Sequence, residues 1–354
     1  MAFKRLDPED FVISNDSLTG TAWSDNVPTL TSFFTSSIQS AGSSGNYYLS
    51  IFQTASTDST AAVQFDIIYS DKQGSGSAFY NNGVVGNSYT KTMYGSYRSL
   101  ILEDENSNFI FGSSVASGFN NCGVLVTSSV AIEGDHFWML SIERARYKQS
   151  LFPGSFNLTI SGSGGANGSL LKLTDNSGDL SSVPFLGSTR AYQIVSGSNG
   201  SGIATNGGYT PDSGSYGIMF PDLGLIMLNP LAISHSIGIE PSRSYDSDGL
   251  NNQRMYNAIS LGSSFGLNSQ ETISSDYVFV RARNSEFNYS ENPSFISGST
   301  GEVIYDNFIN APQTYITTVR MYNDTNELVA VAKMSRPLLK DFTKEALIRV
   351  KLDF

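Results

Sequence analysis

Residues 315–334, YITTVRMYNDTNELVAVAKM, contain two runs rich in β-branched and aromatic residues, separated by turn formers. Such runs favour extended strands, and the four residues Asn323–Asn326 form a loop of the kind that joins two hairpin strands. The stretch therefore predicts a β-hairpin with strands at Tyr315–Tyr322 and Leu328–Met334.

The last nine residues, ALIRVKLDF, continue the same kind of pattern to the end of the sequence. Ala346, Ile348, Val350, Leu352 and Phe354 alternate with residues that are mostly charged. Because successive side chains of a strand point to opposite faces, this alternation predicts a strand with one buried face.

Short strands separated by Gly, Ser, Asn and Asp turns also dominate the rest of the chain. Further strands are expected at Asn46–Thr54, Ala62–Ser70, Phe137–Lys148 and Ser155–Ser161. A helix is expected at Asn251–Leu261, where Met255, Ala258 and Ile259 have helical spacing. The fold class is therefore mainly β, with antiparallel β-sandwich-type domains and an inserted module carrying one or two short helices.

Gly- and Ser-rich segments suggest where the domains meet. Residues 1–45 have little periodicity and are expected to form an N-terminal arm, with Thr29–Ser40 as a possible short helix. The expected domains that follow are a β domain at 46–164, an inserted α+β module at 165–266, and a C-terminal β domain at 267–354.

The amino-acid composition of the chain argues against two classes of function, nucleic-acid binding and membrane insertion. Charged residues make up 15% of the chain and the net charge is −11, which argues against binding nucleic acid through a basic face. No run of residues approaches the ~20 apolar residues of a membrane-spanning helix, so no membrane insertion is expected. The absence of a signal-peptide pattern and the single Cys122 indicate synthesis in a cytoplasm.

Residues able to carry catalysis are sparse. His136 and His235 lack zinc-motif spacing, and Cys122 lacks a CxxC partner, so a packed histidine and a buried thiol are the simpler interpretations. The acidic cluster Glu103-Asp104-Glu105 is interpreted as a solvated turn. Asp246-Ser247-Asp248-Gly249 resembles the start of a calcium loop, but Asn257 stands where the distal glutamate would be, and a helix cap explains it equally.

We therefore expect no catalytic residue, no metal site and no cofactor, and we expect the chain not to be an enzyme. Aromatic residues next to Asn and Gly, as in Asn46-Tyr47-Tyr48 and Phe79–Gly83, are compatible with stacking on sugar rings, although ordinary strands and turns contain the same residues.

Several segments resemble virion structural proteins, of the tail or baseplate type, from contractile-tailed phages of marine cyanobacteria. These segments are Phe11–Trp23, Leu30–Ser37, Glu143–Gly165, Asn268–Glu302 and Ser335–Phe354. The resemblance implies a structural role in the virion with no reactive centre to carry over.

The sequence thus leads to the expectation of a tail or baseplate subunit, present in multiple copies in a symmetric assembly with other phage virion proteins. A receptor- or glycan-binding fibre or adaptor protein, and a neck or head-decoration protein, stay open as alternatives. A glycan-degrading enzyme would need a pair of carboxylates, which no strand pattern brings together.

Overall fold

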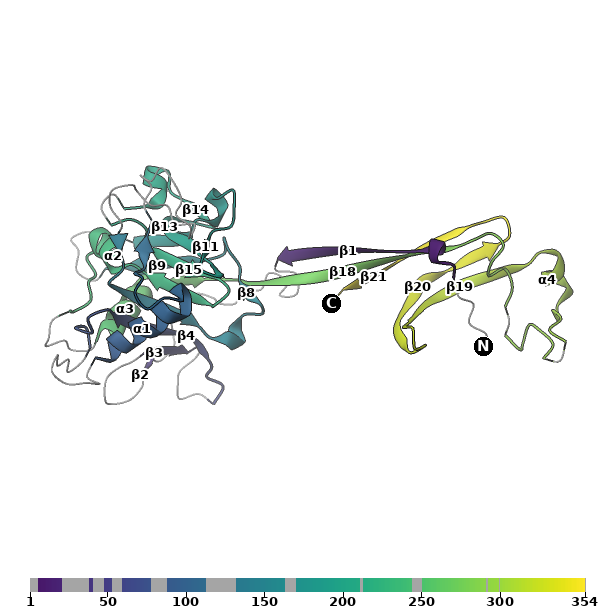
Figure 1. Ribbon diagram of the computed structural model, residues 1–354, viewed down its shortest axis with the longest axis horizontal. Helices are drawn as coiled ribbons and strands as arrows, with labels where there is room; N and C mark the ends of the chain where they lie inside the picture. Colours follow the sequence, from purple (N-terminus) through teal and green to yellow (C-terminus); the bar gives the residue numbers. More distant parts are fainter. Residues whose placement is uncertain are drawn as a thin grey trace. The chain divides into compact units, whose positions relative to one another are not determined.

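The structure is a computed structural model of the chain. It describes residues 6–20, 38–40, 48–52, 59–77, 88–112, 132–162, 170–210, 213–243, 250–290, 292–298 and 300–353. The chain divides into two compact units, which we call the central unit and the terminal unit. The central unit comprises residues 19–271, and the terminal unit combines residues 1–18 with residues 272–354. Figure 1 shows the elements of both units.

The central unit is built on one large antiparallel sheet. Its strands lie in the order β17-β9-β10-β13-β15-β16-β7-β4-β3-β2, and β14 pairs with β13. They are β2 (Ile38–Ser40), β3 (Leu49–Phe52), β4 (Val63–Asp71), β7 (His136–Ile142), β9 (Asn157–Ser161), β10 (Leu170–Asp175), β13 (Tyr192–Ser198), β14 (Ser201–Gly202), β15 (Gly217–Phe220), β16 (Leu225–Leu228) and β17 (Ser264–Gly266). Shorter pairs are β5 (Ile110–Phe111) with β6 (Ile132–Glu133), and β11 (Phe185–Leu186) with β12 (Thr189–Arg190).

Helices cover both faces of this sheet. Trp138 and Leu140 of β7 belong to a core that also contains residues of α2 (Pro230–Ile237) and α3 (Asn251–Gly262). Phe137 and Met139 of the same strand belong to a second core, which contains residues of α1 (Tyr89–Leu102). Since neighbouring side chains of a strand point to opposite faces, the two cores lie on opposite sides of the sheet. An almost continuous apolar strand such as β7 is typical of a sheet that is buried on both faces.

The terminal unit contains two separate β-elements. One is the sheet β1-β18-β21, formed by β1 (Phe11–Gly20), β18 (Ser269–Ala282) and β21 (Ala346–Asp353). The other is a hairpin of β19 (Gln313–Tyr322) and β20 (Leu328–Asp341). The first residues of β18, Ser269 and Gln270, pair with β8 (Ser150–Leu151) of the central unit, so the boundary between the units falls within this strand. The terminal unit also contains the short helices η1 (Pro8–Asp10) and α4 (Asp306–Asn310).

The expectation of a mainly β fold with antiparallel sheets is confirmed. The predicted hairpin, the final strand and the helix at Asn251–Leu261 are present as β19–β20, β21 and α3. Of the possible helix at Thr29–Ser40, only Ile38–Ser40 are described, and they form β2. Helix α1 was not expected from the sequence.

The units divide the chain differently from the expected domains. Residues 46–164 and 165–266 share one sheet, because β9 pairs with β10 and β7 pairs with β16. The start of the expected N-terminal arm forms β1, which pairs with β18. The boundary expected after residue 266 lies close to the observed boundary after Glu271.

Candidate assembly surface

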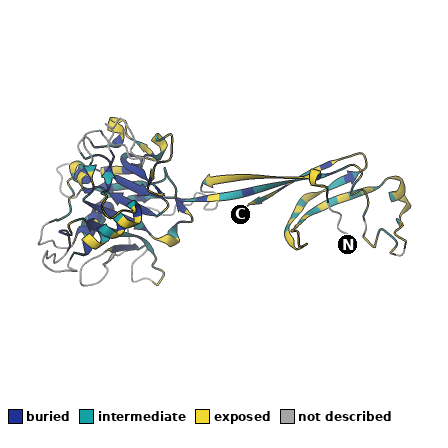
Figure 2. Cartoon of the chain, in the orientation of Figure 1, coloured by how far each residue is buried: buried dark blue, intermediate teal, exposed yellow. Residues whose placement is uncertain are grey.

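The terminal unit buries very little apolar surface. Of the apolar residues that the structure describes as buried, 45 lie in the central unit and only three, Ala282, Ala346 and Val350, lie in the terminal unit. Figure 2 shows the contrast, with dark blue concentrated in the central unit and yellow and teal along the strands of the terminal unit. A unit of this size needs a buried core to offset the entropy lost on folding.

Large apolar side chains are instead exposed along the strands of the terminal unit. Of the 25 large apolar residues described as exposed, 16 belong to this unit. Nine consecutive residues of β1, beginning with Phe11, are exposed. In the hairpin, Tyr315 is 63% exposed and Val329 is 67% exposed. Exposed apolar residues in such number are a feature of surfaces that bind other molecules, so these strands are the candidate assembly surface.

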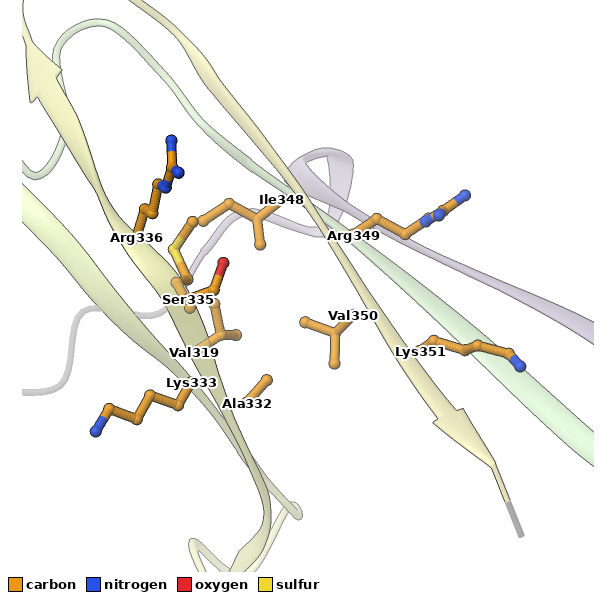
Figure 3. Close-up of a pocket in the computed structure, with 10 residues that line it drawn as sticks. Val319, Ala332, Lys333, Ser335, Arg336, Ile348, Arg349, Val350 and Lys351 are labelled. Atoms are coloured by element: carbon orange, nitrogen blue, oxygen red, sulfur yellow. The ribbon is translucent and has the colours of Figure 1, made fainter.

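A groove lies between the hairpin and β21. The cavity volume is ≈ 330 Å³. Figure 3 shows the side chains of Val319 and Ala332 facing those of Ile348 and Val350 across this space. The groove is therefore an incompletely filled contact between the two β-elements.

The rim of the groove is cationic. Lys333 and Arg336 come from β20, and Arg349 and Lys351 come from β21. Their charged ends point away from the apolar floor (Figure 3). Lys351 pairs with Asp353 at 2.8 Å, and the guanidinium of Arg349 lies 5.7 Å from the ring centre of Tyr277. Lysine and arginine along an exposed strand edge discourage uncontrolled pairing with other strands.

The bulge in β20 explains the position of Arg336. Ile316 pairs with Leu338, whereas Thr318 pairs with Lys333, so β20 carries several more residues than β19 between these two pairs. The extra residues include Pro337, which has no N–H to donate to a ladder. Arg336 belongs to these extra residues and lines the groove.

Specific polar contacts show that the terminal unit has a defined structure despite its small core. The buried carboxylate of Asp10 accepts hydrogen bonds from Nε of Arg281 at 2.9 Å and from Nε of Arg283 at 3.0 Å. Burial raises the pKa of Asp10, but the hydrogen bonds and charges of Arg281 and Arg283 outweigh burial and hold that pKa below its usual value. These contacts fix the start of β1 on the end of β18.

The buried side chain of Lys340 makes a second set of specific polar contacts in the terminal unit. Its ammonium donates hydrogen bonds to the carbonyl oxygens of Asn284 and Asp341 and to Oδ1 of Asn288. All three N–H groups of the ammonium therefore have an acceptor. Burial lowers the pKa of Lys340, while the charges of Asp341 and nearby glutamates oppose that shift. The side chain orders the chain that follows β18.

The central unit contains one buried cluster of titratable residues. Asp71 is fully buried and accepts hydrogen bonds from Oγ of Ser75 at 2.9 Å and from Nε of Arg243 at 3.2 Å. The ring of His136 lies 6.4 Å from that of Tyr69. Burial, together with the charge of Arg243, lowers the pKa of His136 to about 4, so its imidazole is neutral near pH 7.

This cluster has the features of a structural network. The carboxylate of Asp71 also accepts a hydrogen bond from the backbone N–H of Gln73 at 2.9 Å, so protein donors occupy both of its oxygens. Tyr69, Asp71 and His136 are all buried. Nδ1 of His136 has no hydrogen-bond partner in the part of the chain that the structure describes. The interpretation of His136 as a packed histidine agrees with its 7% exposure.

The other candidate residues do not join a common site. His235 is exposed near the end of α2, far along the chain from His136. Glu103 to Glu105 follow α1 and are exposed, as expected for a solvated turn, and Asp104 accepts hydrogen bonds from Asn106 and Ser107. Cys122, Asp246–Gly249, Asn46-Tyr47 and Phe79–Gly83 lie outside the described residues.

Within the described ranges, no three His, Cys, Asp or Glu side chains come together in a group able to hold a metal ion. None of the helices described here combines the length and hydropathy needed to span a bilayer.

The sequence predicted strands β19, β20 and β21 but not the exposure of their apolar side chains. Alternating apolar residues indicated a buried face for β21, and Val350 at 7% exposure agrees with that. No pattern in the sequence predicted that the side chains of Val329 and Val331 would be exposed to solvent. Comparison of the chain with protein-family models, curated proteins and solved structures finds no match.

Proposed function

We propose that this chain is a non-enzymatic structural subunit of a phage virion, a tail or baseplate component of a contractile-tailed phage. It is made in the host cytoplasm and acts in multiple copies, in contact with other virion proteins. The observation that carries the proposal is the terminal unit, whose strands pair in regular ladders but bury very few of their apolar side chains. A subunit that is completed by assembly has this property.

The location of the resembling segments supports the same role. Phe11–Trp23 contains the whole of β1, Asn268–Glu302 contains the whole of β18, and Ser335–Phe354 contains the whole of β21. Three segments far apart in the sequence thus supply the three strands of one sheet. The resemblance to tail and baseplate proteins is concentrated in the part of the molecule that presents the open surface.

The buried cluster of the central unit also favours a structural role over glycan cleavage. Asp71 is fully engaged by protein donors and is paired with a cation, whereas a glycosidase needs two carboxylates that flank a bound sugar. The described residues of this cluster therefore stabilise the fold.

Immunogold electron microscopy of purified particles tests the proposal. The antibody should recognise the central unit, because assembly would cover the terminal unit. Label at the baseplate or along the tail is the expected result, and particles produced without this gene product are the control. Label confined to distal fibres would replace the proposal with the receptor-binding alternative, and particles without any label would refute a virion role.

A further inference from the structure

Among the described residues, Lys340 is the only lysine or arginine that is buried, and its exposed fraction is 0%. It lies in the terminal unit, next to the end of β20. Burial favours the neutral amine over the ammonium and so lowers the pKa of Lys340. Because a neutral lysine amine is a nucleophile, this position gives Lys340 a chemical capacity that an exposed lysine lacks near neutral pH.

One of the three acceptors of Lys340 is a side-chain amide. Two are the backbone carbonyl oxygens of Asn284 and Asp341, and the third is Oδ1 of Asn288, which lies 2.8 Å from Nζ. The carbon bonded to that oxygen, Cγ of Asn288, is an electrophile from which ammonia can leave. The structure therefore holds an amine and an amide in contact, so that their reaction needs no encounter in solution.

The loop that carries Asn288 is held in place by contacts of its own. Nδ2 of Asn288 donates a hydrogen bond to the carbonyl oxygen of Asn284 at 2.7 Å, and Thr314 of β19 donates one to the carbonyl oxygen of Phe287. Phe287 has a φ of 52°, in the left-handed region that a bulky side chain rarely adopts. These contacts and this turn orient the amide of Asn288 beside the amine of Lys340.

A carboxylate belongs to the same cluster. Glu286 lies two residues before Asn288, and its Oε2 atom is buried. Together with Asp341, Glu286 carries a negative charge that opposes the effect of burial on the pKa of Lys340. Formation of a new amide moves one proton from the attacking nitrogen to the leaving nitrogen, and a nearby carboxylate can carry that proton.

The other two nearby carboxylates are less suited to this role. The carboxylate of Asp341 accepts a hydrogen bond from the backbone N–H of Thr343 at 2.9 Å and pairs with Lys344 at 3.4 Å. Glu345 is exposed, so water competes for its proton. Glu286 is therefore the carboxylate best placed to carry the proton.

We propose that Lys340 and Asn288 form an intramolecular isopeptide bond in the folded chain. The neutral amine of Lys340 attacks Cγ of Asn288, so that a bond from Nζ to Cγ forms and the bond from Cγ to Nδ2 breaks. Glu286 takes one proton from Nζ and passes it to Nδ2, which leaves as ammonia. The two side chains supply every atom of the new amide, and no oxidant, reductant or co-reactant is needed.

The bond closes residues 288–340 into a covalent loop. This loop contains α4, β19 and all of β20 except its last residue. A cross-link of this kind restricts the unfolded chain and so favours the folded state, as a disulfide does. It compensates for the small apolar core of the terminal unit, and it goes beyond the virion role without depending on it.

The mass of the intact chain tests the inference. The purified full chain, denatured before the measurement, should be lighter than its unmodified sequence by one molecule of ammonia. Trypsin should fail to cleave after Lys340 and should release one product in which residues 284–320 are joined to residues 334–344. A folded chain with the full mass of its sequence would overturn the inference, whatever the variants below do.

The tryptic product excludes a different source of the same loss. A single asparagine loses ammonia when its side chain cyclises onto the following backbone nitrogen. In that case the two peptides stay separate and Lys340 is still cleaved, and this result would also overturn the inference.

Substitutions of the two partners locate the bond. Lys340→Arg and Asn288→Ala each remove one reacting group, and both variants should keep the full mass of their sequences. Lys344→Arg is the matched control, because the side chain of Lys344 is 56% exposed and lies on the same segment. This control should lose ammonia as the unaltered chain does, and loss of ammonia in Lys340→Arg would overturn the inference.

Glu286→Gln tests the proton carrier with both partners in place. The mass of the chain, recorded at intervals after cell-free synthesis, should show that the bond forms about 100-fold more slowly or not at all. Glu345→Gln, at an exposed carboxylate, should form the bond at the rate of the unaltered chain. Equal rates in the two variants would show that Glu286 carries no proton and would overturn that step.

Discussion

The central unit and the terminal unit use the same kind of strand but differ in what covers it. In the central unit, β7 is buried on both faces by residues of α1, α2 and α3. In the terminal unit, β1 is exposed along nearly its whole length. This difference shows that a sequence can form strands without forming a core around them. A strand needs local propensity and a neighbour to pair with, whereas a core needs a second layer.

The density of charged residues differs between the units, but their net charge per residue does not. The central unit holds 10 Lys and Arg against 18 Asp and Glu in residues 19–271, and the terminal unit holds 11 against 14 in the shorter ranges 1–18 and 272–354. Charged side chains are therefore more frequent in the terminal unit, which also exposes more of the large apolar residues. The two units thus differ in how much apolar surface they bury and in how densely they are charged.

The largest effect is expected in the core of the central unit. Phe137 is fully buried, and its ring centre lies 5.3 Å from that of Phe109 and 5.4 Å from that of Tyr94. Phe137→Ala should lower the free energy of unfolding by about 3–5 kcal/mol, because it leaves a cavity among these rings. Urea denaturation followed by tryptophan fluorescence measures it.

Phe185→Ala is the control for that measurement. Phe185 lies in the same unit but is 47% exposed, so its truncation should change stability by no more than about 0.5 kcal/mol. A similar loss in both variants would mean that the central unit is not held by the core described above.

The next effect concerns pH. His136 has a pKa of about 4 in the folded chain, below the value of 6.5 that it has when unfolded. The unfolded chain therefore binds a proton between these values that the folded chain does not, and stability falls as pH falls from 6.5 towards 4. The loss should reach about 3 kcal/mol by the lower end of this range.

Replacement of the imidazole tests this expectation. His136→Gln should flatten the dependence of unfolding free energy on pH across this window, as measured by urea denaturation at a series of pH values. His235→Gln, at an exposed residue of α2, should retain the full dependence. An unchanged slope in His136→Gln would show that another group is responsible.

A smaller effect is expected at the few buried residues of the terminal unit. Val350 is 7% exposed and pairs with Val278. Val350→Asp should destabilise the sheet by about 1–3 kcal/mol, less than deep burial would cost, because the residue lines the groove. Hydrogen exchange of the β18 amides should speed up while the fluorescence of the central unit stays unchanged.

Leu347→Asp provides the comparison on the same strand. Leu347 is 69% exposed on the opposite face of β21, so in dilute solution the ladder with β18 should remain protected. Equal exchange in the two variants would show that β21 has no preferred buried face.

Much of this architecture could be predicted from local patterns. The hairpin predicted at Tyr315–Tyr322 and Leu328–Met334 lies within β19 and β20, although β20 continues beyond the predicted end to Asp341. The strand Ala346–Asp353 follows from period-two alternation, and α3 follows from Met255, Ala258 and Ile259. These patterns are strong because the same residues satisfy both local geometry and packing.

Helix α1 was not predicted because its residues have weak intrinsic helix propensities. Its sequence, YTKTMYGSYRSLIL, contains β-branched and aromatic residues and Gly95, all of which are weak helix formers. Tertiary packing overrides this preference, because Tyr94, Tyr97 and Ile101 pack in the core with Phe137. The spacing of these three residues was the available signal, and it has the period of a helix.

The exposed surface was harder to predict for a different reason. Alternation indicates which side chains share a face, but it contains no information on whether another layer covers that face. Val329 and Val331 therefore resemble core residues in the sequence and are exposed in the structure. Only the three-dimensional arrangement separates an internal core from an exposed strand face.

The smallest expected effect tests how the first strand is held on the terminal unit. The folded pKa of Asp10 lies below its unfolded value, because Arg281 and Arg283 outweigh the cost of its burial. Its contribution to stability is therefore present above the unfolded pKa near 3.8 and is lost as pH falls through the folded pKa. Asp10→Asn should remove this acid dependence from the protection factors of the β18 amides, while Asp7→Asn, at a side chain that is 63% exposed, should preserve it. If Asp10→Asn kept the full acid dependence, β1 would be held by its backbone ladder alone, and the ionic contacts at its start would not distinguish the terminal unit from a simple edge strand.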